Sequence, residues 1–113
     1  MNEPVRISPG EARIKIMAGN ALLVCAYKSD ERFEQNHLEG AISFSDFIKI
    51  KQTLPKDKEI IFYCAWHEEA SAAGQAVKHI EEGFTNITVL RGGVEAWKEA
   101  GFRLVWVILN NHV

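Results

Sequence analysis

The segment EIIFYCAWHEEASAA, residues 59–73, contains an apolar strand, a short polar loop and the start of a helix. Its first part, 59–64, is a continuous apolar run, which is typical of a strand buried on both faces of a sheet. The run ends in Cys64. A helix is predicted from about Glu68 to Glu81, and Gly83 is placed to end it. The segment therefore places a cysteine at the carboxyl end of a strand, just before a loop and a helix.

The rest of the chain continues the same alternation of strands and helices. Two more apolar runs, 21–26 and 86–90, are predicted strands, and a further short strand follows a turn at Glu39 and Gly40. Helices are predicted over 9–17, 29–36, 45–54 and 94–100. Apolar strands that alternate with helices predict an α/β fold, a three-layer α/β/α sandwich with a mainly parallel central sheet.

Serines are placed to cap several of these helices. Ser8 and Glu11 fit a capping box around the first helix, and Ser45 is expected to cap the helix over 45–54. The end of the chain, VWVILNNHV over 105–113, leaves three alternatives open: an edge strand, a cover for a hydrophobic surface, or a dimer contact.

Length and composition restrict the class of protein. A chain of 113 residues predicts a single domain over 1–113. A formal net charge of -2 gives no basic surface for nucleic acid. The N-terminus has no signal-peptide pattern and no apolar run approaches the roughly 20 residues that span a bilayer, so we expect a cytoplasmic protein without a membrane partner. With two cysteines and no convincing ligand spacing, we expect no metal and no cofactor.

Cys64 is the candidate nucleophile. In open α/β sheets, ligands bind beyond the carboxyl ends of the strands. Backbone N–H groups of the loop and of the helix N-terminus can converge on a sulfur there and favour the thiolate, which is the reactive form. Its position at a strand end does not by itself identify Cys64 as a nucleophile. Buried free cysteines are usually inert, and Cys25 also ends a strand. Cys64 differs from Cys25 in preceding a compact loop and a long helix.

Four segments in this order resemble the rhodanese-like domain family: ISPGEARIKI, LLVCAYKSDERFEQNHLEGAI, EIIFYCAWHEEASAA and GFTNITVLRGGVEAWKEAGF. The resemblance implies a sulfurtransferase in which Cys64 accepts a sulfane sulfur as a persulfide and passes it to a thiophilic acceptor. The implied partners are a sulfur donor and a thiol acceptor, either small molecules or proteins. The implied cradle around the sulfur consists of Ala65, Trp66, His67, Glu68 and Glu69, with Ala70 leading into the helix.

The loop departs from the family pattern at two positions. Glu69 stands where the family has an arginine, and His67 stands where it often has a glycine. An arginine would stabilise a thiolate and attract an anion such as thiosulfate, whereas two carboxylates do the opposite. Glu68 and Glu69 also suit the first turn of a helix, where acids complement the dipole. We therefore expect poor thiosulfate activity and a thiol-based or protein persulfide donor. Without that arginine, phosphatase chemistry is not expected.

The family's first signature is altered as well. Cys25, Ala26 and Tyr27 stand where it has Asp-x-Arg, and Asn36 stands where it has a glycine before His37. Cys25 and Tyr27 follow a neighbouring strand and can line the same mouth as Cys64. Cys25 is interpreted first as core filler; a disulfide with Cys64 is the alternative and needs Cα atoms within about 7 Å.

Several other side chains have open interpretations. Arg91 lies at the end of the strand over 86–90 and has three possible roles. It supplies positive charge near Cys64, it pairs with Glu68 or Glu69, or it has no partner. His67 either pairs with Cys64 or faces solvent, and Trp66 either forms a pocket wall or binds a partner. His37 is expected to tie a turn together by hydrogen bonds. His79 and His112 are expected to be solvated, and Trp97 to be in the core.

Three functions follow, in order of preference. The first is a sulfurtransferase or persulfide carrier with Cys64 as its nucleophile. The second is a binding or regulatory module on the same fold whose altered loop has lost turnover. The third is a thiol redox protein that uses both cysteines.

Overall fold

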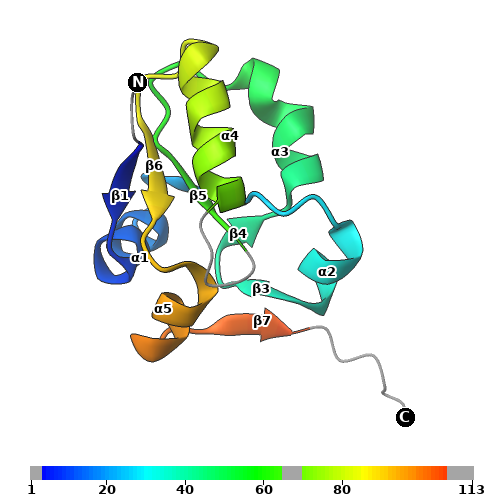
Figure 1. Cartoon of the computed structure of the whole chain (residues 1–113), viewed down its shortest axis with the longest axis vertical. Coiled ribbons are helices and arrows are strands. Elements are labelled where there is room, and N and C mark those ends of the chain that lie inside the picture. Colours follow the sequence, from blue (N-terminus) through cyan, green and yellow to red (C-terminus); the bar gives the residue numbers. More distant parts are fainter. Residues whose placement is uncertain (1–3, 65–69, 107–113) are drawn as a thin grey trace.

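The computed structural model describes residues 4–64 and 70–106. Its centre is a five-stranded parallel sheet with strand order β1-β6-β5-β2-β4 (Figure 1). The strands are β1 (Val5–Ile7), β2 (Leu22–Cys25), β4 (Ala41–Ile42), β5 (Ile60–Tyr63) and β6 (Ile87–Leu90). The prediction of a mainly parallel central sheet is confirmed, and β5 is its middle strand.

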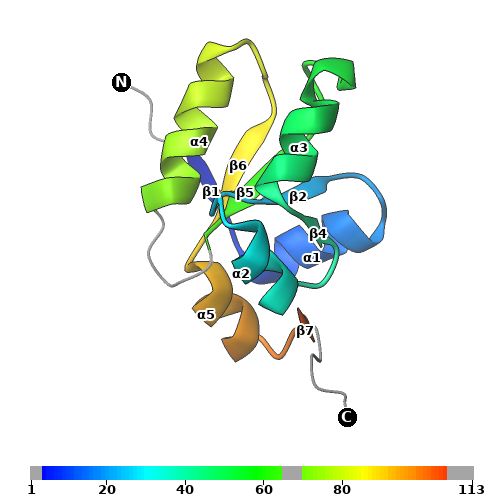
Figure 2. The same ribbon diagram turned by 90° about the vertical axis from the view of Figure 1, so that its right-hand side faces the viewer.

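Helices cover both faces of this sheet (Figures 1 and 2). They are α1 (Pro9–Met17), α2 (Asp30–Gln35), α3 (Phe44–Ile50) with the 3-10 turn η1 (Lys51–Thr53), α4 (Ala70–Glu81) and α5 (Gly93–Glu99). Side chains of α3 and α4 pack in one cluster of buried residues, and side chains of α1, α2 and α5 pack in the other. The three-layer α/β/α sandwich is therefore confirmed.

Alternate residues of the central strands β2 and β5 enter opposite clusters. Val24 and Phe62 pack with Phe47 of α3, whereas Leu23 and Ile61 pack in the cluster that contains Trp97 of α5. Because both faces of the sheet are covered, the central strands are apolar without interruption. Trp97 is fully buried, as its expected core position requires.

A second, two-stranded sheet was not predicted. β3 (Asn36–Leu38) pairs antiparallel with β7 (Leu104–Trp106) near the end of the main sheet toward which the β6 arrow points (Figure 1). This pairing answers the open question for 104–106, which form a strand, while 107–113 lie outside the described residues. β1 and β3 escaped prediction because each has three residues, too few to show a hydrophobic period.

The capping predictions have mixed outcomes. Ser8 caps α1 in a capping box, since its Oγ accepts from the Glu11 N–H at 3.1 Å. The prediction that Ser45 caps the third helix is wrong, because Ser43 Oγ accepts the Asp46 N–H at 3.0 Å and α3 begins at Phe44. Ser45 instead donates its hydroxyl to Asp30 Oδ2 at 3.1 Å.

The prediction that His79 is solvated is also wrong. Its side chain is fully buried on α4 among the rings of Phe47, Phe62 and Phe84. Since the Gln75 carbonyl oxygen accepts a hydrogen bond from Nδ1 at 2.8 Å, Nε2 is free to accept from Lys51 Nζ at 3.1 Å. Burial lowers the pKa of His79 from its usual 6.5, so the ring is held neutral.

Candidate active site

Cys64 directly follows the last residue of β5, at the carboxyl end of the middle strand of the sheet. Its side chain is 3% exposed and belongs to the cluster on the α3 and α4 face, together with Ala26, Phe62 and Ala72. The described part of α4 starts at Ala70, which is exposed. Strand, cysteine and helix thus occur in the order that a site at a strand end requires.

Most of the predicted cradle lies outside the described residues. Ala65, Trp66, His67, Glu68 and Glu69 lie outside the described residues, as does the predicted start of the helix at Glu68. The alternative that Arg91 pairs with Glu68 or Glu69 stays a prediction, because both glutamates lie outside the described residues.

Arg91 lies at the same edge of the sheet as Cys64. β5 and β6 are neighbours in parallel register, with Phe62 level with Val89. Cys64 and Arg91 each follow this pair by two residues, so both stand just beyond the carboxyl ends of adjacent strands. The Arg91 side chain is exposed, and its backbone N–H donates to Ile7 O at 2.9 Å.

Cys25 faces the other side of the sheet from Cys64. It is level with Tyr63 in the β2–β5 register and lies in the cluster that contains Tyr63 and Trp97. Both cysteines are free thiols. A disulfide between them is disfavoured, since adjacent positions across this register send Cys25 and Cys64 to opposite faces.

The Cys25 thiol is held protonated by its surroundings. Burial raises its pKa most, and the nearby charge of Cys64 adds to this. Hydrogen bonds with the Tyr27 backbone and the Tyr63 hydroxyl act in the opposite direction without reversing the shift. In the thiol form, Sγ donates to Tyr27 O at 3.8 Å. Cys25 is therefore buried like core filler, yet it has polar neighbours.

Tyr63 is a site residue that sequence reasoning missed. Its side chain is 1% exposed, and its hydroxyl oxygen accepts the Leu38 N–H at 3.3 Å. Burial raises the pKa of Tyr63 well above its usual value, and charge on Cys25 adds to the shift. The available signal was a single hydroxyl in the otherwise apolar run IIFYC.

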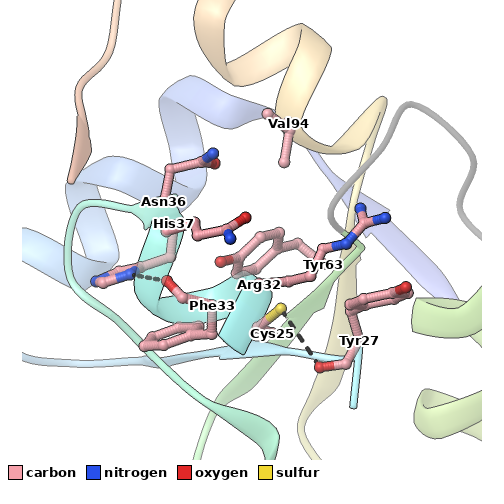
Figure 3. A pocket seen from close by; sticks show the side chains of 9 residues that line it. Cys25, Tyr27, Arg32, Phe33, Asn36, His37, Tyr63 and Val94 are labelled. Atoms are coloured by element: carbon pink, nitrogen blue, oxygen red, sulfur yellow. Dashed lines mark hydrogen bonds between the residues drawn. The ribbon is translucent and has the colours of Figure 1, made fainter. Parts of the chain in front are cut away.

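A small cavity opens beside Cys25 and Tyr63 (Figure 3). Its volume is about 90 Å³, and Tyr27, Phe33, His37 and Val94 line it along with these two residues. Cys25 and Tyr27 therefore share one cavity. Cys64 is not among its described lining residues. The expectation that Cys25 and Tyr27 share a mouth with Cys64 stays a prediction, because 65–69 lie outside the described residues.

His37 ties the segment around this cavity together, as predicted. Its Nδ1 lies 2.7 Å from Phe33 O, and its ring stacks on the Phe33 ring with centroids 3.8 Å apart. The α2–β3 junction is thereby fixed beside the cavity.

Within 4–64 and 70–106, no group of three or more His, Cys, Asp or Glu side chains is arranged to hold a metal ion. In the same residues, no helix has both the length and the apolar character needed to cross a membrane.

The fold and the strand-end cysteine define an α/β protein with a candidate nucleophile at the carboxyl edge of a parallel sheet. The family model for the rhodanese-like domain matches residues 8–100, and the chain belongs to this family.

Solved structures agree with this fold. The BH2092 protein from Bacillus halodurans is 25% identical, with a TM-score of 0.75 over 91% of this chain and 77% of that one. The Alr3790 protein from Anabaena sp. is 18% identical, with a TM-score of 0.77 over 91% of this chain and 94% of that one. A thiosulfate sulfurtransferase from Pseudomonas aeruginosa is 22% identical, with a TM-score of 0.77 over 90% of this chain but 20% of that one.

Proposed function

We propose that this rhodanese-like domain is a sulfurtransferase or persulfide carrier in which Cys64 is the nucleophile. The observation that carries the proposal is the position of Cys64, at the carboxyl end of the middle strand β5 and ahead of α4, in a chain of this family. Both cysteines are free thiols, and burial raises the pKa of Cys25. The thiolate is the attacking species, so Cys25 is the poorer candidate.

The proposed reaction consists of two thiol exchange steps. The Cys64 thiolate attacks the outer sulfur of a sulfane donor, forms a new S–S bond and breaks the donor's S–S bond, and the donor leaves as a thiolate. An acceptor thiolate then attacks the outer sulfur of the Cys64 persulfide. The bond to Cys64 breaks, the Cys64 thiolate is regenerated, and the acceptor leaves as a persulfide. No external oxidant or reductant is required.

The loop composition favours a particular kind of donor. Glu69 stands in place of the positive charge that would attract thiosulfate, and Glu68 adds a second negative charge beside it. A low-molecular-weight persulfide or a protein persulfide brings less charge to the sulfur and fits this loop better. We place the reaction in a reducing cytoplasm, where thiol donors and acceptors are abundant and both cysteines stay reduced.

The test is intact mass spectrometry after exposure to a persulfide donor. The wild-type chain is expected to gain the mass of one sulfur atom and to lose it again on addition of a thiol. Cys64→Ser abolishes the gain, and the matched variant Cys25→Ser retains it. A gain that persists in Cys64→Ser and vanishes in Cys25→Ser contradicts the assignment.

One observation favours a second function. The loop lacks the family's arginine and carries Glu69 in its place, so turnover is weakened and a binding or regulatory module on the same fold is the alternative. Such a module forms no persulfide, and its partner affinity survives in Cys64→Ser. A redox function through a Cys25–Cys64 disulfide is less favoured, because the two side chains lie in different clusters.

A further inference from the structure

Arg91 lies on the same face of the sheet as Cys64. In β6, Val89 packs in the cluster that contains Cys64, whereas Leu90 packs in the other cluster. The β1–β6 ladder continues past Leu90, because the Arg91 N–H donates to Ile7 O at 2.9 Å. Since side chains alternate along a strand, Arg91 emerges on the face of Val89, which is also the face of Cys64.

Arg91 and Cys64 are also neighbours across the sheet. Phe62 is level with Val89 in the parallel β5–β6 register, and Cys64 and Arg91 each lie two residues further on. Figure 1 shows β5 and β6 side by side, with α5 directly after β6. Neighbouring strands are about 4.8 Å apart, a distance that an extended arginine side chain can span. The Arg91 guanidinium can therefore reach a molecule bound in front of the Cys64 sulfur.

The backbone at Arg91 is fixed on both sides. The ladder to β1 precedes it, and Gly92 and Gly93 follow it with φ of 77° and 58°. These left-handed residues turn the chain into α5 directly after the strand. A Cβ atom at Gly92 would lie 2.6 Å from Ala96 Cβ, so the turn requires glycine there. Arg91 thus occupies a defined position at the end of a strand.

The Arg91 side chain is available to a ligand. It is exposed, and its guanidinium makes no hydrogen bond, ion pair or ring contact with any residue in 4–64 and 70–106. Glu68 and Glu69 also contribute charge near Cys64 in the sequence, and both lie outside the described residues. These acids oppose negative charge at the sulfur, whereas a guanidinium can bind a carboxylate on another part of the same molecule. The position of the donor's charge therefore matters more than its amount.

We propose that Arg91 is a specificity-determining residue of the Cys64 site, which binds the carboxylate of a small-molecule persulfide whose outer sulfur passes to Cys64. This inference rests on the proposed function. It identifies the donor as the persulfide of a small thiol with a carboxylate a few bonds away from the sulfur. Guanidinium and carboxylate form two parallel hydrogen bonds, which orient the donor as well as attract it. The donor leaves as a thiolate that still carries the carboxylate.

The test compares two donors that differ in charge, the persulfides of 3-mercaptopropionate and of 3-mercaptopropionamide. A Cys25→Ser background removes the other free thiol from the measurement. The initial rate of Cys64 persulfide formation is followed by intact mass after rapid quenching. The rate with the carboxylate donor divided by the rate with the amide donor measures the preference for a carboxylate.

Arg91→Gln is expected to lower this ratio about threefold, an effect the size of one exposed ion pair. Arg91→Lys is expected to lower it less, because lysine keeps the charge but not the planar fork of donors. The matched control Lys78→Gln removes an exposed cation near the other end of α4 and leaves the ratio unchanged. An unchanged ratio in Arg91→Gln overturns the proposal, as does an equal fall in Lys78→Gln.

A second background separates direct binding from charge compensation in the loop. With Glu68→Gln and Glu69→Gln both in place, Arg91→Gln is expected to lower the ratio by the same factor. If the fall disappears in that background, Arg91 only neutralises the loop glutamates and the proposal is wrong.

Alkylation of Cys64 tests the carboxylate site without sulfur transfer. Iodoacetate and iodoacetamide have nearly the same shape, but only iodoacetate is an anion. With either reagent the Cys64 thiolate bonds to the methylene carbon, the C–I bond breaks and iodide leaves. The ratio of the iodoacetate rate to the iodoacetamide rate is expected to fall in Arg91→Gln, and an unchanged ratio contradicts the inference. A protein that forms no Cys64 persulfide but shows this fall loses the proposed function and keeps the carboxylate site.

Discussion

The hydrogen bond between the Leu38 N–H and the Tyr63 hydroxyl, beside the cavity, can be tested by a single substitution. Tyr63→Phe removes one oxygen atom and leaves the ring in place. That oxygen accepts the Leu38 N–H at 3.3 Å, and both residues are at most 1% exposed. The substitution therefore leaves a buried backbone donor without its acceptor, which costs about 1–3 kcal/mol.

The assay is urea unfolding followed by circular dichroism. The free energy of unfolding is expected to fall by about 1–3 kcal/mol with an unchanged m value, because the surface exposed on unfolding stays the same. A thermal scan is expected to show a decrease of about 3–6 °C in Tm for each kcal/mol lost. Tyr63→Phe also removes a hydrogen bond that lowers the pKa of Cys25, so alkylation of Cys25 at neutral pH slows further.

Tyr27→Phe is the matched control for this variant. It removes the same atom from a tyrosine that lines the same cavity, and the Tyr27 hydroxyl makes no hydrogen bond to any residue within 4–64 and 70–106. We expect a change of about 0.5 kcal/mol or less. If Tyr63→Phe and Tyr27→Phe unfold at the same urea concentration, the Leu38 N–H does not depend on Tyr63 and the reasoning is refuted.

Three further predictions concern the loop, a helix cap and a buried histidine. Glu69→Arg is expected to raise the rate of reaction with thiosulfate roughly tenfold at low salt; an unchanged rate in a folded variant contradicts the electrostatic argument. Ser43→Ala is expected to lower the free energy of unfolding by about 1 kcal/mol, and Ser45→Ala by less, because Ser43 caps α3; equal losses by urea titration contradict this. Because burial lowers the pKa of His79 from 6.5, its contribution to stability is complete above that pH and is lost as the pH falls below it. The urea midpoint is therefore expected to fall between about pH 7.5 and about pH 5.5, and a fall of the same size in His79→Gln contradicts the assignment.

The sequence predicted those features of the fold that depend on local patterns. Apolar runs marked β2, β5 and β6, and the capping box at Ser8 marked the start of α1. Ser43 was missed because Ser45 lies only two residues later, and either serine could begin the helix. The burial of His79 could not be predicted from its own helix, since Phe47 and Lys51 come from other elements.

Some features of the candidate site could also be predicted from the sequence, and others could not. Cys64 was found because a cysteine that ends an apolar run is visible in the sequence. The cavity was not found, because Tyr63 and Arg32 meet only after β2, β5 and α2 have packed together. That Cys25 and Cys64 face opposite sides of the sheet follows from the register of β2 with β5, which no local pattern gives.

Tracing an isotopically labelled sulfane sulfur tests the central claim most directly. Trypsin places the two cysteines in different peptides, since cleavage after Lys58 and Lys78 releases 59–78 with Cys64, and cleavage after Lys15 and Lys28 releases 16–28 with Cys25. After a brief exposure to a labelled persulfide donor and alkylation of the products, the account predicts the label in peptide 59–78 and its disappearance when an acceptor thiol is added. Label confined to peptide 16–28, or label that no thiol removes from 59–78, contradicts it.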